Sequence, residues 1–184
     1  MSLIVILIFF MLPVISILLL KHSKKLAIIF LSIPFMIMVM VVGWMIYEKN
    51  DHFVSSTFLP QEGLGEVSLL DPVNDEFKER HGPYSKSENV FYKELLRFSP
   101  FHVGTNDDDR IVYLQANDNN MATHKGVTIG TQIEKVKNLY GEDFYSRTEQ
   151  GMPIIGYIDR ESNITVQFWH YQGKVMHIRM YYNR

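Results

Sequence analysis

Two histidines near the C-terminus, His170 and His177, are candidate ligands for a metal ion. They flank Gln172-Gly173, a pair typical of a two-residue hairpin turn. Such a turn would pair His170 with Val175 and would place His177 diagonally across from His170 on the same face of a sheet. Two imidazoles that lie this close could share a metal ion.

This pair alone does not make a zinc site, because zinc in proteins is held by at least three side chains. Nothing in the sequence brings His102 or His124 to the pair. The alternative is a half-exposed sheet face on which histidines lie beside aromatic residues. We therefore predict no metal and no cofactor, and keep His170 and His177 only as weak candidates for metal ligands.

The densest acidic cluster is Asp107-Asp108-Asp109, which follows Asn106. A calcium loop would need further oxygen ligands at fixed spacing, together with a glycine and a distal glutamate. The residues after Asp109 do not supply them. The cluster therefore indicates a solvated hairpin turn.

Enzyme signatures are missing from the sequence. It contains no G-x-S-x-G, H-E-x-x-H or S-x-x-K motif and no glycine-rich phosphate loop. Cysteine is absent, which excludes a thiol nucleophile, a disulfide framework and the lipidated cysteine of a lipoprotein. We predict no catalytic activity; the alternative is a small metal- or histidine-dependent hydrolase that uses His170 and His177.

The elements that would position these residues begin with two uncharged apolar runs, Leu3–Leu20 and Leu26–Tyr47, joined by Lys21–Lys25. At about 1.5 Å per residue, each run is long enough to cross the ~30 Å hydrocarbon core of a bilayer. Pro13 and Pro34 lie inside the runs, where membrane helices tolerate proline. Residues 1–47 are therefore predicted to form a two-helix transmembrane anchor.

The lysines of the connector predict the orientation of this anchor. Lys21, Lys24 and Lys25 should hold Lys21–Lys25 in the cytoplasm, which leaves the N-terminus and everything after Tyr47 outside. A cleaved signal peptide is the alternative. It is disfavoured because no charge precedes the first run and no small-residue cleavage site follows either run.

The charge of the outer part limits its partners. The whole chain carries a formal charge of −2, and the three connector lysines contribute +3, so the remainder carries −5. An acidic domain argues against nucleic acid and against direct binding to anionic lipid or anionic wall polymer. The expected partners are membrane lipid around the anchor and a protein or cell-wall component at the outer face. Residues 48–62 are polar and unpatterned, and we interpret them as a stalk.

Two later segments share one layout. A helix is predicted over Asn74–Arg80 and another over Glu134–Leu139, with Asp71 and Thr131 as their caps. A glycine in the left-handed region should end each helix, and the sequence has Gly82 and Gly141 there. Three strands are expected after each helix: Val90–Phe98, Phe101–Thr105 and Arg110–Ala116, then Pro153–Asp159, Ile164–Tyr171 and Lys174–Tyr182.

The predicted fold class is therefore α+β, with the transmembrane helical hairpin followed by tandem αβββ units that have antiparallel sheets. The first unit covers residues 63–122 and the second covers residues 123–184. The recurrence of the helix, the glycine stop and the last hairpin indicates a duplication.

The second unit also carries a family resemblance. The string Gly126–Thr131, followed by Val136, Tyr140-Gly141, Gly156–Asp159 and Gly173–Val175, resembles the CAP-associated N-terminal domain of Gram-positive extracytoplasmic proteins. It is more loosely similar to outer-membrane-assembly lipoproteins and β-lactamase-inhibitor-like modules. The resemblance covers about Gly63–Arg184 and implies a binding or scaffolding fold with no catalytic residues. Two features depart from these families: the chain ends at Arg184 without a larger CAP domain, and it lacks the lipoprotein cysteine.

Overall fold

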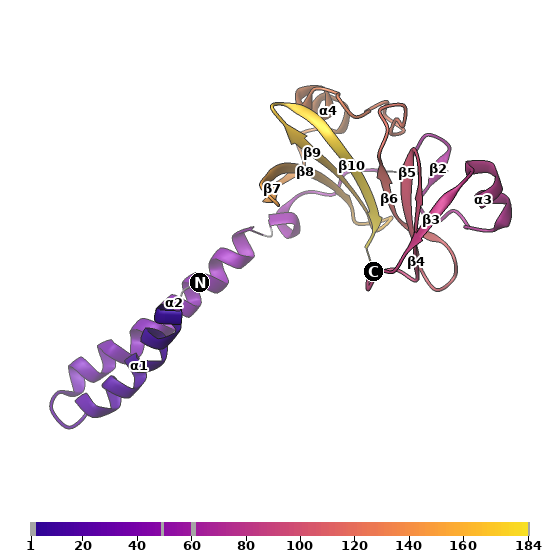
Figure 1. The fold of residues 1–184 in the computed structure, drawn as a ribbon. Coiled ribbons are helices and arrows are strands. Elements are labelled where there is room, and N and C mark those ends of the chain that lie inside the picture. The colour runs from indigo at the N-terminus through magenta and orange to yellow at the C-terminus, as the bar shows by residue number, and fades with distance from the viewer. Residues whose placement is uncertain (1–2, 49, 60–61, 184) are drawn as a thin grey trace. The chain divides into compact units, whose positions relative to one another are not determined.

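The computed structural model describes residues 3–48, 50–59 and 62–183. The chain divides into two compact units, Met1–Lys49 and Asn50–Arg184 (Figure 1). Each unit is described by itself.

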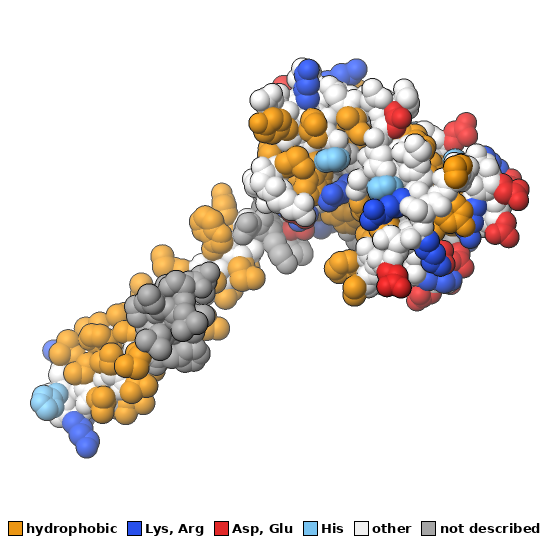
Figure 2. All heavy atoms as spheres, viewed as in Figure 1, with side chains coloured by type: hydrophobic (Ala, Val, Ile, Leu, Met, Phe, Trp, Pro, Cys, Tyr) orange, Lys and Arg blue, Asp and Glu red, His pale blue; other side chains and the backbone are white. Residues whose placement is uncertain are grey.

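The N-terminal unit consists of two helices, α1 (Leu3–Leu19) and α2 (Lys24–Glu48). They contact each other where the Ser16 hydroxyl donates a hydrogen bond to the Ala27 carbonyl oxygen at 2.7 Å. Among the described residues, one helix is long and apolar enough to cross a membrane, and it covers Lys24–Tyr47. Its apolar side chains are mostly exposed, as Figure 2 shows. The prediction of an apolar N-terminal helix suited to membrane anchoring is confirmed.

The C-terminal unit combines two short helices with a large antiparallel sheet, which confirms the α+β class. It opens with η1 (Asn50–Phe53) and a small hairpin of β1 (Gly63–Leu64) and β2 (Val67–Ser68). The helix α3 (Asp75–His81) follows, with β3 (Tyr84–Ser87), β4 (Glu94–Phe98), β5 (Phe101–Thr105) and β6 (Ile111–Ala116). Then come α4 (Ile133–Tyr140), β7 (Tyr145–Glu149), β8 (Met152–Asp159), β9 (Ile164–Tyr171) and β10 (Lys174–Tyr182).

The eight strands β3 to β10 form one sheet in the order β3-β4-β5-β6-β10-β9-β8-β7. The prediction of tandem αβββ units, each with its own sheet, is not confirmed. Each helix is followed by four strands, and β6 pairs with β10 to join both sets of strands into one sheet. The strands β3 and β7 were not predicted from the sequence, because both are short and polar edge strands that lack an apolar alternation.

The hydrophobic core lies between the helices and one face of the sheet. From α3, Phe77 packs edge-on against Phe98 and Phe101, with ring centroids 5.8 and 6.4 Å apart. From α4, Tyr140 lies 5.1 Å from Tyr157 and 5.0 Å from Phe168. Both helices thus cover the same face, which is called the helix-covered face below.

The helix ends differ from the sequence prediction in their caps. Asn74 caps α3, because its side-chain oxygen accepts a hydrogen bond from the Phe77 amide at 2.8 Å. The predicted cap Asp71 instead accepts from the Ser68 amide and closes a turn. The hydroxyl of Thr131 likewise accepts from Thr128 rather than capping α4. The predicted glycine stops are confirmed, since Gly82 and Gly141 follow the helices with positive φ angles of 81° and 97°.

The segment expected to be a stalk, residues 48–62, does not stand away from the domain over its described part. The Thr57 amide donates to the Ile158 carbonyl oxygen at 2.7 Å, and the Leu59 amide donates to Asp159 at 2.9 Å. Arg160 binds the carbonyl oxygen of Asp51. Leu59 is fully buried, so residues 50–59 belong to the domain. The polar composition of residues 50–59 gives no indication of this packing, because the packing depends on a few backbone hydrogen bonds and on one leucine.

Two glycines inside strands allow tyrosine rings to lie flat against the sheet. A Cβ atom added at Gly156 would lie 2.2 Å from the Tyr145 ring, its cross-strand partner. A Cβ atom added at Gly104 would lie 2.7 Å from the Tyr92 ring. Each glycine therefore leaves the room that an aromatic ring occupies on the face opposite the helices.

We expect Gly156→Ala to lower the free energy of unfolding of the domain by about 1–3 kcal/mol, because the new methyl group overlaps the Tyr145 ring. Gly141→Val should cost about 1 kcal/mol or more through its positive φ angle, since nothing lies within 4 Å of that position. Thermal or urea unfolding of the full chain in detergent measures both, with the exposed Ser146→Ala as control.

A double-mutant cycle separates the two causes. In a Tyr145→Leu background, Gly156→Ala should lose most of its cost, whereas Gly141→Val should keep its cost. An undiminished effect of Gly156→Ala in that background would show that the ring is not the obstacle.

Candidate functional site

The sheet face that points away from α3 and α4 contains a hollow and is called the concave face below. Tyr145 on β7 and Tyr181 on β10 are three strands apart in the sheet, yet their hydroxyl oxygens lie 3.5 Å apart. A hollow of about 260 Å³ lies in this face, lined by Tyr92, Tyr113, Arg147, Glu149, Gln167, Arg179 and Tyr181. The concave face is defined here by these residues together with Arg97, His102, Gln115, Tyr145, Trp169 and His177, which the strand register places on the same side.

A buried glutamine organises the floor of the hollow. The Gln167 side-chain nitrogen donates to the Tyr145 hydroxyl at 2.7 Å and to the Tyr181 hydroxyl at 3.0 Å. Its side-chain oxygen accepts from the Trp169 indole at 3.3 Å. Gln167 is only 2% exposed, and these bonds offset the cost of burying its amide. The positions of two phenols and an indole thus depend on one amide.

Arg179 is held between both halves of the sheet. Its guanidinium carbon lies 4.0 Å from the ring centroid of Trp169, a cation–π contact. Its Nε donates to the side-chain oxygen of Gln115 at 3.2 Å, and Tyr113 donates to the same oxygen at 2.5 Å. Gln115 is the cross-strand partner of Arg179 on β6. The guanidinium is therefore fixed in orientation before any ligand arrives.

Arg147 lies on the other side of the hollow, on β7. One of its Nη nitrogens pairs with Glu149 at 2.9 Å. Its Nε is buried and has no hydrogen-bond partner among the described residues. A buried donor without a partner is costly, so this nitrogen is an unsatisfied polar group at the edge of the hollow.

The concave face is basic although the domain is acidic. Residues 50–184 carry −5, because the first 49 residues contribute +3 to the chain's charge of −2. The concave face nevertheless has three arginines, Arg97, Arg147 and Arg179, against one carboxylate, Glu149. Acidic side chains visible in Figure 2 gather instead toward the α3 side. The concave face therefore differs in charge from the domain as a whole, a difference that the net charge does not reveal.

The two candidate histidines do not share a face. The hairpin pairs His170 with Val175 as predicted, but a β-bulge between Val175 and His177 shifts the register by one residue. His177 therefore lies opposite Trp169 on the concave face, whereas His170 lies on the helix-covered face. The prediction that the two imidazoles lie together is wrong, because a one-residue shift in register moves each later side chain of the strand to the other face of the sheet.

The structure offers no replacement for that pair. Among the described residues, no group of three or more His, Cys, Asp or Glu side chains could hold a metal ion. His102, named as a distant candidate, lies on the concave face opposite Arg97.

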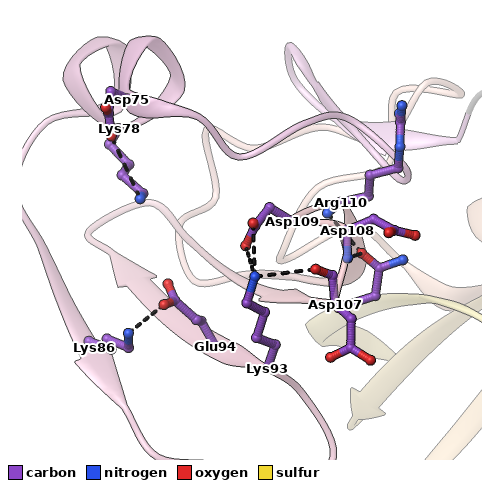
Figure 3. A network of polar contacts seen from close by, with 10 residues as sticks. Asp75, Lys78, Lys86, Lys93, Glu94, Asp107, Asp108, Asp109 and Arg110 are labelled. Carbon is purple, nitrogen blue, oxygen red and sulfur yellow. Dashed lines mark hydrogen bonds and ion pairs between the residues drawn. The ribbon is translucent and has the colours of Figure 1, made fainter.

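The acidic cluster forms the turn between β5 and β6, as predicted (Figure 3). Lys93 binds both carboxylate oxygens of Asp109 at 2.9 Å and the Asp107 carbonyl oxygen at 3.2 Å. The side-chain oxygen of Asn106 accepts from the amides of Asp108 and Arg110 and so closes the turn. The ammonium group of Lys93 therefore neutralises the carboxylate of Asp109.

Most of this site is not apparent from the sequence. The strand pattern predicts that Trp169 faces away from His170, but it does not single out Arg179, Gln167, Gln115 or Arg147. The alternation of side chains along Ile164–Tyr171 could have indicated Gln167, because it lies two residues before Trp169 and therefore on the same face of the strand. The partnership of Gln115 with Arg179 has no local signal, because it depends on the pairing of β6 with β10.

Comparisons with known proteins add no relative. No family model matches the chain, and no curated protein or solved structure matches it.

We expect the pKa of His177 to lie below its usual value of 6.5, because burial first and the Arg179 charge second disfavour the imidazolium. Arg179→Gln should raise this pKa, which an NMR titration of the histidine ring protons measures. Since the unfolded chain binds the proton more tightly, His177 should make the domain less stable as the pH falls below about 6.5. An unchanged pKa in Arg179→Gln would show that the two groups do not interact.

Proposed function

We propose that this protein is a membrane-anchored binding module of the cell envelope, without catalytic activity, and that the concave face is its binding surface. The observation that carries the proposal is the fixed set of aromatic and cationic side chains around the hollow. The buried Trp169 and Gln167 hold Arg179 and the tyrosines of the hollow in place through a cation–π contact and hydrogen bonds before any partner arrives. Such preorganised groups bind with little loss of side-chain entropy.

The arrangement favours binding over hydrolysis. The hydrolase alternative depended on His170 and His177 acting together, and these residues lie on opposite faces of the sheet. The phenols in the hollow are also poor bases at neutral pH, because burial raises the pKa of Tyr113 and Tyr145 above the usual value of 10.

We also propose that both α1 and α2 cross the membrane as a hairpin. The Ser16–Ala27 contact supports this, since small residues permit close approach of membrane helices. The Lys21–Lys25 connector would then lie in the cytoplasm, with the N-terminus and the domain outside.

The proposal retains the family resemblance to CAP-associated N-terminal domains of Gram-positive extracytoplasmic proteins. The order of one helix followed by four strands, which occurs twice between Asp75 and Tyr182, supports a duplication. Partners of such a module would be membrane lipid around the helices and a protein or cell-wall component at the outer face. Nucleic acid is not among them, because the domain as a whole is acidic.

The topology is testable because the chain has no cysteine, so a single introduced thiol reports its own location. We expect Ser146→Cys, which is exposed on β7, to react with a membrane-impermeant maleimide on intact cells. His22→Cys in the connector should react only after the membrane is permeabilised. Labelling of His22→Cys on intact cells, or protection of Ser146→Cys, would contradict the proposed orientation.

The binding surface is testable with the same chemistry. A benzophenone-maleimide attached to Ser85→Cys, which the register places beside Arg97 on the concave side, should give a discrete adduct in cells after irradiation. The matched probe at Ser146→Cys, which pairs with Ile155 on the helix-covered side, should not give this adduct. Equal adducts from both positions, or none from Ser85→Cys, would contradict the concave face as the binding surface.

A further inference from the structure

Arg179 presents an unused edge to the hollow. Its Nε donates to Gln115 and its guanidinium carbon lies 4.0 Å from the centroid of the Trp169 ring, so two contacts restrict the guanidinium. Within the described residues, neither Nη nitrogen of Arg179 has a hydrogen-bond partner. Two parallel N–H donors on a fixed plane match the two oxygens of a carboxylate or a phosphate.

A second cation lines the same hollow. Arg147 lines it from β7, with a buried Nε that has no partner in the described part of the chain. Glu149 neutralises one end of Arg147, whereas no carboxylate pairs with Arg179 among the described residues. The hollow therefore keeps a net positive charge that an anion would compensate.

The hydroxyl groups add a further donor. Both Tyr145 and Tyr181 accept a hydrogen bond from Gln167, and their oxygens lie 3.5 Å apart. At most one of the two can donate to the other, so at least one hydroxyl proton has no acceptor among the described residues. Burial raises the pKa of Tyr145, which keeps its own hydroxyl protonated at neutral pH.

The size of the hollow limits the ligand. Its volume of about 260 Å³ lies just below the range of roughly 300–1,000 Å³ for small-molecule sites. The rings of Tyr92 and Tyr113, stacked with centroids 5.1 Å apart, form one of its walls. A ligand of this size is a single anionic group on a small molecule or at the end of a longer one.

We propose that the hollow is a receptor for a small oxyanion, a carboxylate or a phosphate, which the Nη nitrogens of Arg179 bind and the positive charge of Arg147 assists. This inference rests on the proposed function in taking the concave face as the binding surface, and it adds the chemical class of the ligand. The net charge of the domain argues against anionic partners, but the local charge of this face favours them.

Trp169 makes the site observable. The chain has two tryptophans, Trp44 and Trp169, so Trp44→Phe leaves the indole beneath Arg179 as the only one. The full chain in detergent is titrated at constant ionic strength with inorganic phosphate and, separately, with D-glucuronate. D-glucose serves as the uncharged control. We expect a saturable change in Trp169 emission with one or both anions and none with glucose. The anion that saturates the change at the lower concentration identifies phosphate or carboxylate as the preferred group.

Variants then assign the effect to the site. Arg179→Gln should weaken binding about tenfold or more, because a charge-assisted hydrogen-bonded contact is removed. Arg179→Lys keeps the charge without the paired donors and should also weaken binding. Arg80→Gln makes the same change of charge on the exposed face of α3 and should leave binding unchanged. If Arg179→Gln fails to fold, Arg147→Gln decides instead.

The proposal is overturned if neither anion gives a saturable response. It is also overturned if Arg179→Gln, like Arg80→Gln, binds the anion as tightly as the parent chain does. This failure differs from a failure of the proposed function. A Ser85→Cys adduct in cells without an anion response would overturn the ligand class alone, whereas the loss of that adduct would overturn the binding surface itself.

Discussion

The pairing of β6 with β10 is the interaction on which the rest of the domain depends. Four residue pairs, from Ile178 opposite Ala116 to Tyr181 opposite Tyr113, join two sets of four strands that would otherwise form separate sheets. On one face this pairing brings Leu114, Ile178 and Met180 into a single core. On the other it sets Gln115 beside Arg179, so both surfaces of the sheet rely on the same backbone ladder.

The two faces divide the physical tasks of the domain. The helix-covered face removes apolar side chains from water and provides most of the stability. The concave face buries polar groups that must find partners, and Gln167 meets this requirement through three hydrogen bonds. A buried network of this kind is rigid because losing one member leaves the others without partners. Rigidity around a polar hollow is what selective binding requires.

The sequence predicted the long inner strands well, because their apolar patterns and turn residues agree. The predicted spans Phe101–Thr105, Ile164–Tyr171 and Lys174–Tyr182 match β5, β9 and β10. It failed at β3 and β7, whose polar side chains carry no periodic signal. It also failed after Val175, because no residue type marks the bulge that turns His177 to the concave face.

The candidate site was less predictable than the fold, for a related reason. Trp169, Gln167 and Arg179 come from two strands whose alternation can be traced, but their partners Gln115 and Tyr145 come from elsewhere in the chain. Local pattern shows which residues share a strand face. It does not show which strands become neighbours, and the chemistry of this site depends on those neighbours.

The short polar strands at the two ends of the sheet also affect how copies of the protein meet one another. An exposed strand edge can pair with another chain, which leads to aggregation. β3 carries Lys86, and β7 carries Arg147 and Glu149, so charged side chains accompany both free edges. For a domain anchored as we propose, neighbours share a two-dimensional surface and collide often. Short, charged edge strands would prevent neighbouring molecules from pairing their strands into a continuous intermolecular sheet.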